Sequence, residues 1–190
     1  MSPSLAARLA PAWDGGLFEP APISDRELAA IIDLVYRKSG ITLHEGKRAL
    51  VTARLQRRLK AIGVRSYSDY LAYLGRDTSG GELVMLLDAI STNHTSFFRE
   101  PQHFDFLRNR VLPELAALRR PTLDVWSAAC SSGEEPYTLA MVLDEALPEA
   151  EARQVRIVAS DLSTKVLGMA RSGVYKMERL REVAPPLLRK

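Results

Sequence analysis

The fold is decided by the stretch LDVWSAACSSGEEPY at residues 123–137. Its first seven residues are mostly apolar or small, which predicts a buried strand, and the small residues that follow predict a turn and then a helix over about 135–147. Downstream, VRIVA at 155–159 predicts a second strand that ends at Asp161, and residues 164–170 begin another helix. Strand, helix, strand, helix is the opening of a parallel α/β sheet.

Two strands cannot complete such a sheet. A parallel sheet needs neighbouring strands at its edges and helices on both faces to bury its backbone and its apolar side chains. The sequence contains no internal repeat that would supply further strands. We therefore expect residues 121–190 to hold only the first part of an α/β domain.

The first ninety residues have the pattern of a small all-helical domain. A helix start is indicated by Ser24, which is placed to cap, and by Glu27, which is placed to reach back in a capping box. Gly40 marks a left-handed stop for this helix. Apolar residues at helical spacing predict further helices over about 45–61, around 70–74 and over 83–90.

The same patterns give the domain boundaries. A helix from about 101 to 117 is expected to bridge two domains, with Pro113 ending or kinking it. The predicted order is a flexible leader rich in Ala, Pro and Gly at 1–22, a helical domain at 23–92, a loop and linking helix at 93–120, and the partial α/β domain at 121–190.

Composition excludes several classes of protein. The 46% hydrophobic content is ordinary for a globular chain, no apolar run is long enough to span a bilayer, and the first residues lack a signal-peptide pattern. We therefore expect a cytoplasmic protein. A single cysteine, Cys130, allows no internal disulfide, and the three histidines are scattered, so no metal site is expected. The formal charge of +3 fits an acidic protein partner or nucleic acid equally well.

Polar residues follow both predicted strands at the edge where an open α/β sheet binds ligands. Asp161 is placed to accept bonds from both hydroxyls of a ribose, and the small residues 130–133 let backbone approach a ligand. The glycines of a phosphate fingerprint are absent, and Glu134 and Glu135 would repel a pyrophosphate, so S-adenosylmethionine suits the site better than NAD. From spacing alone, a cofactor role for Asp161 is as well supported as a helix-capping role, and the support for a cofactor role of Glu135 is weaker.

Three long motifs carry a resemblance to a known family. They are STNHTSFFRE at 91–100, WSAACSSGEEPY at 126–137 and ASDLS at 159–163, and they resemble, in order and spacing, the CheR-type chemotaxis receptor protein-glutamate O-methyltransferases. The similarity runs from about Ile23 to the C-terminus, including RLQRRL at 54–59 and ARSGVY at 170–175. It implies an α+α/β fold, in which a small all-helical domain precedes the first part of a Rossmann-like S-adenosylmethionine-dependent methyltransferase domain.

The resemblance also implies a set of cofactor contacts. The positions that match the family's binding residues are Asn93, Thr95, Arg99, Glu135 and Asp161. Asp161 would hold the ribose hydroxyls and Glu135 would face the methionyl amino group. Arg99, the catalytic candidate, would either pair with the methionyl carboxylate or orient the incoming glutamate. In the expected reaction an ionised glutamate oxygen attacks the methyl carbon without a strong base, giving a methyl ester and S-adenosylhomocysteine.

The basic helix over about 45–61 allows several interpretations. The sequence alone favours a solvated polar face, with nucleic-acid binding as a weaker alternative. In the family that the chain resembles, the helical domain meets the cytoplasmic methylation region of the receptor, which implies that cations of this helix steer an acidic partner. The candidates are Arg54, Arg57 and Arg58, with Lys47 and Lys60 as weaker ones. On this basis neither nucleic acid nor membrane insertion is expected, and the complete protein is expected to be a monomer.

Several conspicuous residues near the motifs are interpreted as structural. His94 is expected to be a hydrogen-bonding loop residue, Phe97 and Phe98 core aromatics, Cys130 a small buried thiol, and Trp126 a packing residue within its strand. The family's later Cys-Arg-Asn-like motif and its β-insertion do not occur before the last residue, at 190. An alternative function is therefore a truncated, non-catalytic module that binds the receptor or the cofactor.

Overall fold

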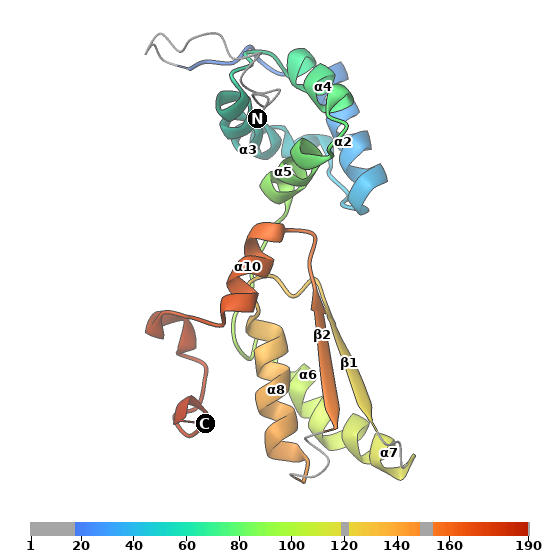
Figure 1. The fold of residues 1–190 in the computed structure, drawn as a ribbon, viewed down its shortest axis with the longest axis vertical. Helices are drawn as coiled ribbons and strands as arrows, with labels where there is room; N and C mark the ends of the chain where they lie inside the picture. Colours follow the sequence, from blue (N-terminus) through green and yellow to red (C-terminus); the bar gives the residue numbers. More distant parts are fainter. Residues whose placement is uncertain (1–17, 119–121, 149–153, 190) are drawn as a thin grey trace, which may run out of the picture. The chain divides into compact units, whose positions relative to one another are not determined.

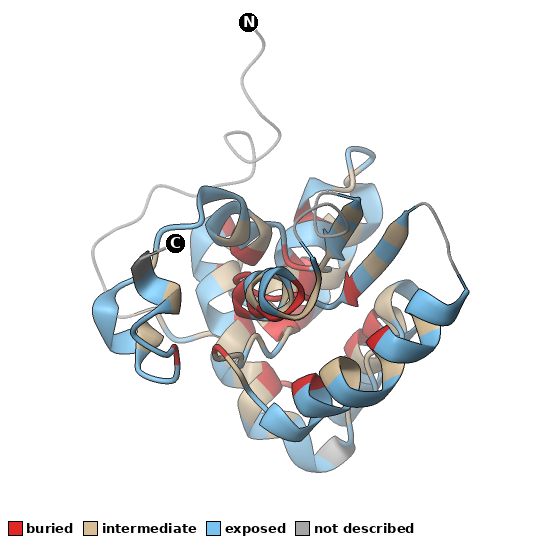
Figure 2. Cartoon of the chain, turned by 90° about the horizontal axis from the view of Figure 1, so that it is seen from below, coloured by how far each residue is buried: buried red, intermediate tan, exposed pale blue. Residues whose placement is uncertain are grey.

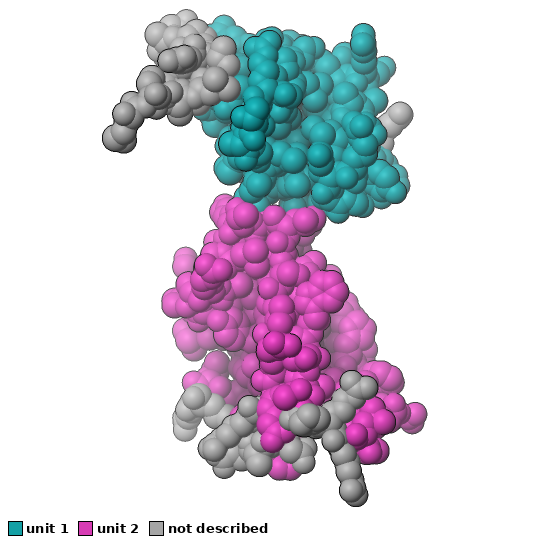
Figure 3. Space-filling view, turned by 45° about the vertical axis from the view of Figure 1, so that its right-hand side comes forward, with its two compact units in different colours: residues 1–91 teal, residues 92–190 magenta. Residues whose placement is uncertain are grey.

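The computed structural model describes residues 18–118, 122–148 and 154–189. The chain divides into two compact units, one that ends at Ser91 and one that begins at Thr92 (Figures 1 and 3). Within the described ranges, no helix is both long and apolar enough to cross a bilayer. Most of the expected leader, up to position 17, lies outside the described residues.

The first unit is helical, which confirms the prediction for this half of the chain. Its helices are α2 (Asp25–Ser39), α3 (Arg48–Ile62), α4 (Tyr67–Arg76) and α5 (Gly81–Ile90), with a short 3₁₀ turn at Glu45–Lys47 ahead of α3. The helix expected from about 45 therefore begins as this tighter turn and becomes α-helical at Arg48.

One apolar cluster holds these helices together. Each helix contributes buried side chains at helical spacing, and the cluster comprises Ile23, Leu28, Ile31, Val35, Val51, Leu55, Leu59, Ile62, Tyr67, Tyr70, Leu86, Leu87 and Ile90. Phe18 packs against the cluster, and the Ala21 N–H donates to the Arg65 carbonyl at 2.8 Å. The helical unit thus includes chain that precedes α2.

Helix α2 begins at the capping box that the sequence predicts. The Ser24 hydroxyl accepts the Glu27 N–H at 3.3 Å, and the Glu27 carboxylate accepts the Ser24 N–H at 2.8 Å. Hydrogen bonds from Ser24, with one from the Ser68 hydroxyl, lower the pKa of the Glu27 carboxyl to about 2. At the other end Gly40 has a left-handed φ of 73°, and its N–H donates to the Tyr36 carbonyl.

A buried acid lies in this core. The Glu82 side chain is 5% exposed, and its carboxylate accepts two bonds from the Arg58 guanidinium, at 3.0 and 2.6 Å. The Tyr70 hydroxyl donates to the same carboxylate at 2.9 Å. Burial, and then the charge of Glu82, raise the pKa of Tyr70. The three side chains form a network, in which the loss of Arg58 would leave the charge of Glu82 buried without compensation.

The second unit contains the predicted order of strand, helix, strand and helix. Its elements are α6 (Pro101–Phe106), a π-helical turn at Leu107–Val111, α7 (Leu112–Ala117), β1 (Leu123–Ala128), α8 (Glu134–Ala146), β2 (Val155–Ser160), α10 (Thr164–Ser172) and 3₁₀ turns at Met177–Leu180 and Leu187–Arg189. Strands β1 and β2 pair in parallel, with Leu123 opposite Val155 and Ala128 opposite Ser160. The prediction of a parallel sheet is confirmed.

The helical path from Pro101 continues past Pro113 because it widens first. In the π-helical turn the Leu112 N–H donates to the Leu107 carbonyl, five residues earlier. Pro113 follows directly, in the first turn of α7, where it has no N–H to donate and its ring needs room beside the preceding turn. The proline therefore does not end the helix, which runs on to Ala117.

The two faces of the sheet differ in cover. Helix α8 and the side chain of Ile157 on β2 line one hollow together, whereas on the opposite face Trp126 is 70% exposed and Val158 is also exposed. Figure 2 shows that intermediate and exposed residues make up most of both strands. The prediction that the first strand is buried, with Trp126 as a packing residue, is therefore wrong. The physical reason is that, within the described ranges, a helix covers only the face that carries Ile157. The Trp126 indole N–H instead donates to the Ser160 hydroxyl at 3.0 Å.

Candidate cofactor site

Two loops border the carboxyl ends of the strands. Loop A, residues 92–100, precedes α6, and loop B, residues 129–133, joins β1 to α8. All non-glycine residues with positive φ in the described ranges lie in these loops: Phe98 (51°), Glu100 (56°), Ala129 (62°) and Ser131 (49°). Such backbone costs on the order of 1–3 kcal/mol per residue and clusters at functional sites. The strain therefore points to these loops as the candidate site.

Asp161 ties loop B to the end of β2. One of its carboxylate oxygens accepts the Ser131 N–H at 2.8 Å, and the other accepts the Ser163 N–H at 2.8 Å. The Ser131 hydroxyl also donates to the Asn93 carbonyl at 3.1 Å, which connects loop A. A carboxylate offers about four acceptor positions, so two remain for other donors such as ribose hydroxyls. Asp161 can thus hold the turn and still bind a sugar.

A small hollow lies between loop A, loop B and the start of α8. Its volume is about 130 Å³, and it is lined by His94, Thr95, Ser96, Arg99, Glu100, Phe104, Ala129 and Glu135. The Ser127 hydroxyl donates to the Glu135 carboxylate at 2.7 Å and holds it in place. Arg99 donates to the His94 carbonyl at 3.1 Å and is otherwise exposed.

The hollow collects three of the five predicted cofactor residues. Thr95, Arg99 and Glu135 line it together, whereas Asn93 and Asp161 lie outside it, where both are bonded to Ser131. A guanidinium and a carboxylate that line the same hollow suit a ligand with both charges, such as the methionyl end of S-adenosylmethionine. The donor set of the second unit therefore fits this cofactor.

The sequence prediction missed a buried ion pair beside loop B. Glu134 is fully buried, and its carboxylate pairs with the Arg179 guanidinium and accepts the Ser132 hydroxyl at 2.7 Å. A serine, a glycine and two acids in succession indicate a helix start but give no sign of a partner 45 residues away (179 − 134). Neither acid carries a local signal of burial, because Asp and Glu in the first turn of a helix are commonly exposed.

Cys130 is buried at the start of loop B, as predicted. Burial, and then the charges of Asp161 and Glu135, raise the pKa of its thiol. The residue therefore stays protonated at neutral pH and is a poor nucleophile. Among the residues that the structure describes, no group of three or more His, Cys, Asp and Glu side chains is placed to hold a metal ion.

The aromatic residues of loop A pack within the second unit. Phe97 is buried, and its ring meets the Tyr175 ring edge-on with centroids 5.0 Å apart. Phe98 packs edge-on against Phe104 at 5.9 Å. The interpretation as a core aromatic is confirmed for Phe97, whereas Phe98 is only half-buried.

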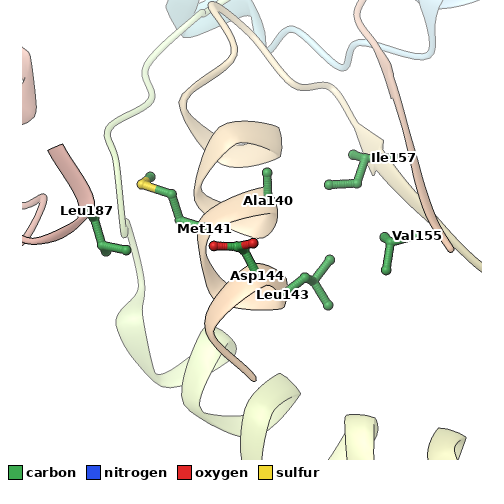
Figure 4. A pocket seen from close by; sticks show the side chains of 7 residues that line it. All are labelled: Ala140, Met141, Leu143, Asp144, Val155, Ile157 and Leu187. Carbon is green, nitrogen blue, oxygen red and sulfur yellow. The ribbon is translucent and has the colours of Figure 1, made fainter. Parts of the chain in front are cut away.

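A larger hollow lies elsewhere in the second unit, between α8, β2 and the last 3₁₀ turn. It has a volume of about 460 Å³ and is lined by Ala140, Met141, Leu143, Asp144, Val155, Ile157 and Leu187 (Figure 4). Its walls are mostly apolar, and it contains no predicted site residue. Its chemistry favours packing over catalysis.

Comparison with known proteins identifies the family. Residues 93–190 match the family model described as CheR methyltransferase, SAM binding domain, and residues 26–91 match CheR methyltransferase, all-alpha domain. The chain belongs to the CheR methyltransferase family. The model that matches residues 93–190 describes a domain that binds S-adenosylmethionine, which is the cofactor expected from the sequence.

Similar CheR proteins include three chemotaxis protein methyltransferases. That of Borreliella burgdorferi is 43% identical over 163 residues, which are 83% of this chain and 58% of the relative. The Klebsiella aerogenes protein is 40% identical over 182 residues, or 96% of this chain and 61% of the relative. The Escherichia coli protein is 39% identical over 172 residues, or 90% and 58%. The chain thus spans about three-fifths of the length of these relatives.

The helical unit of this CheR chain contains the three predicted substrate-binding arginines on α3. Arg54 donates to the backbone carbonyl of Ser91 at 3.2 Å, and Arg58 forms the buried pair with Glu82. Arg57 is exposed. Two of the three arginines therefore make contacts inside the helical unit, and Arg57 alone of the three is exposed.

Proposed function

We propose that the chain is part of an enzyme that transfers the methyl group of S-adenosylmethionine to glutamate side chains of chemotaxis receptors, forming methyl esters in sensory adaptation. The observation that carries the proposal is the hollow at the strand ends, where Thr95, Arg99 and Glu135 lie together in a unit that matches a SAM-binding domain. Relatives named chemotaxis protein methyltransferase, which match most of this chain, support the reaction class.

Each cofactor residue has a task that its surroundings allow. Asp161 accepts the ribose hydroxyls with its two remaining acceptor positions, and Glu135, held by Ser127, faces the methionyl amino group. Thr95 in loop A lines the hollow, and Asn93 contacts loop B through its carbonyl, which accepts the Ser131 hydroxyl. When bound, the cofactor supplies a methyl group activated by its positive sulfur.

Arg99 is the proposed catalytic residue. It is the exposed cation of the hollow, so it can pair with the methionyl carboxylate or with the incoming glutamate. A glutamate with a pKa of roughly 4.3 is already ionised at neutral pH, so no residue has to remove a proton. The residues of the site contribute alignment and exclusion of water.

The helical domain expected at residues 23–92 is proposed to recognise the cytoplasmic methylation region of the receptor. Residues 93–120 are proposed to form the cofactor loop and its helix, and residues 121–190 the cofactor domain. Among the α3 cations, Arg57 would make the direct contact with an acidic receptor helix, because Arg54 and Arg58 already bond within the unit. Those two arginines act in recognition by keeping α3 in place.

The test is transfer of radiolabelled methyl groups to membranes that carry a cognate receptor. The expected result is base-labile label on the receptor, reduced about a hundredfold by Arg99→Ala, the order of loss found when one charge-stabilising group is removed from an active site. Arg110→Ala is the matched control, because this exposed arginine pairs with exposed Glu114 at 3.8 Å and lines no part of the hollow. Calorimetric binding of S-adenosylhomocysteine without any label would instead establish the alternative, a non-catalytic binding module.

The remaining proposals concern cellular location, oligomeric state and binding specificity. We place the protein in the cytoplasm, where the methylation region of a receptor lies, as a monomer when complete. Steering by cations of α3 should be specific for the receptor, with no role for nucleic acid. A receptor-binding assay with competing duplex DNA checks this, since loss of receptor binding at a modest DNA concentration would contradict it.

A further inference from the structure

The segment that follows α10 touches both loops of the candidate site. We name residues 173–180 the clasp; they comprise the stop of α10 and the 3₁₀ turn at Met177–Leu180. Two of its side chains, Tyr175 and Arg179, contact residues of loop A, loop B and the start of α8. Neither side chain has a role in the function proposed above.

Tyr175 connects the two loops. Its hydroxyl donates to the Ser132 carbonyl of loop B at 2.7 Å, while its ring packs edge-on against buried Phe97 of loop A at 5.0 Å. Gly133 leaves the space for this hydroxyl, because a Cβ there would lie 2.6 Å from it. Burial, and then the charge of Glu134, raise the pKa of Tyr175, so the hydroxyl keeps the proton that it donates.

Arg179 fixes the start of α8. Its guanidinium pairs with the fully buried Glu134 and also donates to the Ser132 hydroxyl at 3.3 Å, although 44% of the Arg179 side chain is exposed. The carboxylate of Glu134 depends on this contact, because a buried charge without a partner is strongly unfavourable. The Arg179 side chain therefore bridges solvent and the inside of the turn.

We propose that the clasp positions the cofactor-binding loops, with Tyr175 and Arg179 as positioning residues for Asp161 and Glu135. The residues that the clasp holds, Ser132 to Glu134, lie directly between Ser131, whose N–H donates to Asp161, and Glu135 of the hollow. A shift of loop B would move both cofactor contacts together. The proposal rests on the proposed function, because it assumes that these residues meet S-adenosylmethionine.

The first measurement is calorimetric binding of S-adenosylhomocysteine to the full protein. Arg179→Met should weaken binding by about 10- to 100-fold, by analogy with the loss found when partners that orient metal-ligating residues are removed. Arg179→Lys keeps the positive charge and should recover part of this loss. Arg181→Met, a change of an exposed arginine two residues away, should bind like the wild type. Equal binding by Arg179→Met, Tyr175→Phe and the wild type would overturn the proposal.

The second measurement is hydrogen exchange of the unliganded protein, which does not depend on the proposed function. Loop B contains structured amides, such as Ser131 N–H on Asp161 and Gly133 N–H on the Cys130 carbonyl at 3.0 Å. Arg179→Met should speed exchange across 129–137, while the first unit exchanges as in the wild type. If the wild type fails to bind S-adenosylhomocysteine, the proposed function fails, and unchanged exchange in Arg179→Met would separately refute the clasp.

Discussion

Replacing Gly133 with alanine should destabilise the second unit by about 3 kcal/mol. The backbone there has a φ of 99°, and a side chain in such a conformation costs about 1–2 kcal/mol. The new Cβ would also lie 2.6 Å from the Tyr175 hydroxyl and 2.9 Å from the Ala170 Cα, and overpacking of this kind costs about 1–3 kcal/mol. The Tyr175 hydroxyl can rotate away only by giving up its bond to loop B, and Ala170 can retreat only with α10.

Scanning calorimetry can follow the unfolding transitions of both units in one sample. For a domain of this size each kcal/mol moves the melting temperature by about 4–8 °C, so Gly133→Ala should lower the transition of the second unit by at least about 12 °C. Gly168→Ala is the matched control, because this glycine lies inside α10 with no atom within 4 Å of a new Cβ, and it should stabilise by about 0.5–1 kcal/mol. Gly40→Ala, which has the positive φ of 73° without any neighbour, should cost about 1 kcal/mol in the first unit. If Gly133→Ala cost no more than Gly40→Ala, the close packing of loop B against the clasp would be refuted.

Three further changes test other parts of the two units. Arg58→Met should lower the free energy of unfolding of the first unit by about 3 kcal/mol in urea denaturation, because buried Glu82 loses its partner, whereas Arg57→Met should stay within about 0.5 kcal/mol of the wild type. The folded-state pKa of Glu27 is about 2, below its ordinary value of 4.5, so the unfolded chain binds more protons than the folded chain between these pH values. The free energy of unfolding should therefore fall as the pH drops through that window. Glu27→Gln should make this pH dependence flatter in urea titrations. Asp161→Asn leaves one oxygen for two backbone amides and should weaken S-adenosylhomocysteine binding about tenfold by calorimetry, and wild-type affinity would contradict its place in the site.

Local signals allowed most secondary structure to be predicted from the sequence. The capping box of Ser24 and Glu27 needs only residues three apart, and the left-handed Gly40 needs only its own backbone. The strand that ends before Asp161 is likewise determined by a short run of β-branched and apolar residues. Elements whose cause lies within a few residues were therefore placed correctly.

Contacts between distant residues were beyond the reach of such patterns. Arg54 and Arg58 have the spacing of a basic surface, but Arg58 meets Glu82, 24 residues further along the chain, and is mostly buried. The pair of Glu134 and Arg179 is separated more widely still, and neither residue type indicates burial by itself. Charge patterns predict where ions lie on a helix, whereas the choice between solvent and an internal partner depends on tertiary packing.

Trp126 gives the second unit an optical signal. Its side chain is mostly exposed on the open face of the sheet, and its indole N–H donates to the hydroxyl of Ser160, the last residue of β2. The chain has two tryptophans, so Trp13→Phe leaves a single emitter whose surroundings are known. Any molecule that packs over this face would remove water from the indole and shift its emission to shorter wavelengths. Trp126, which was expected to be buried and is exposed, therefore becomes a fluorescent reporter of binding to this face of the sheet.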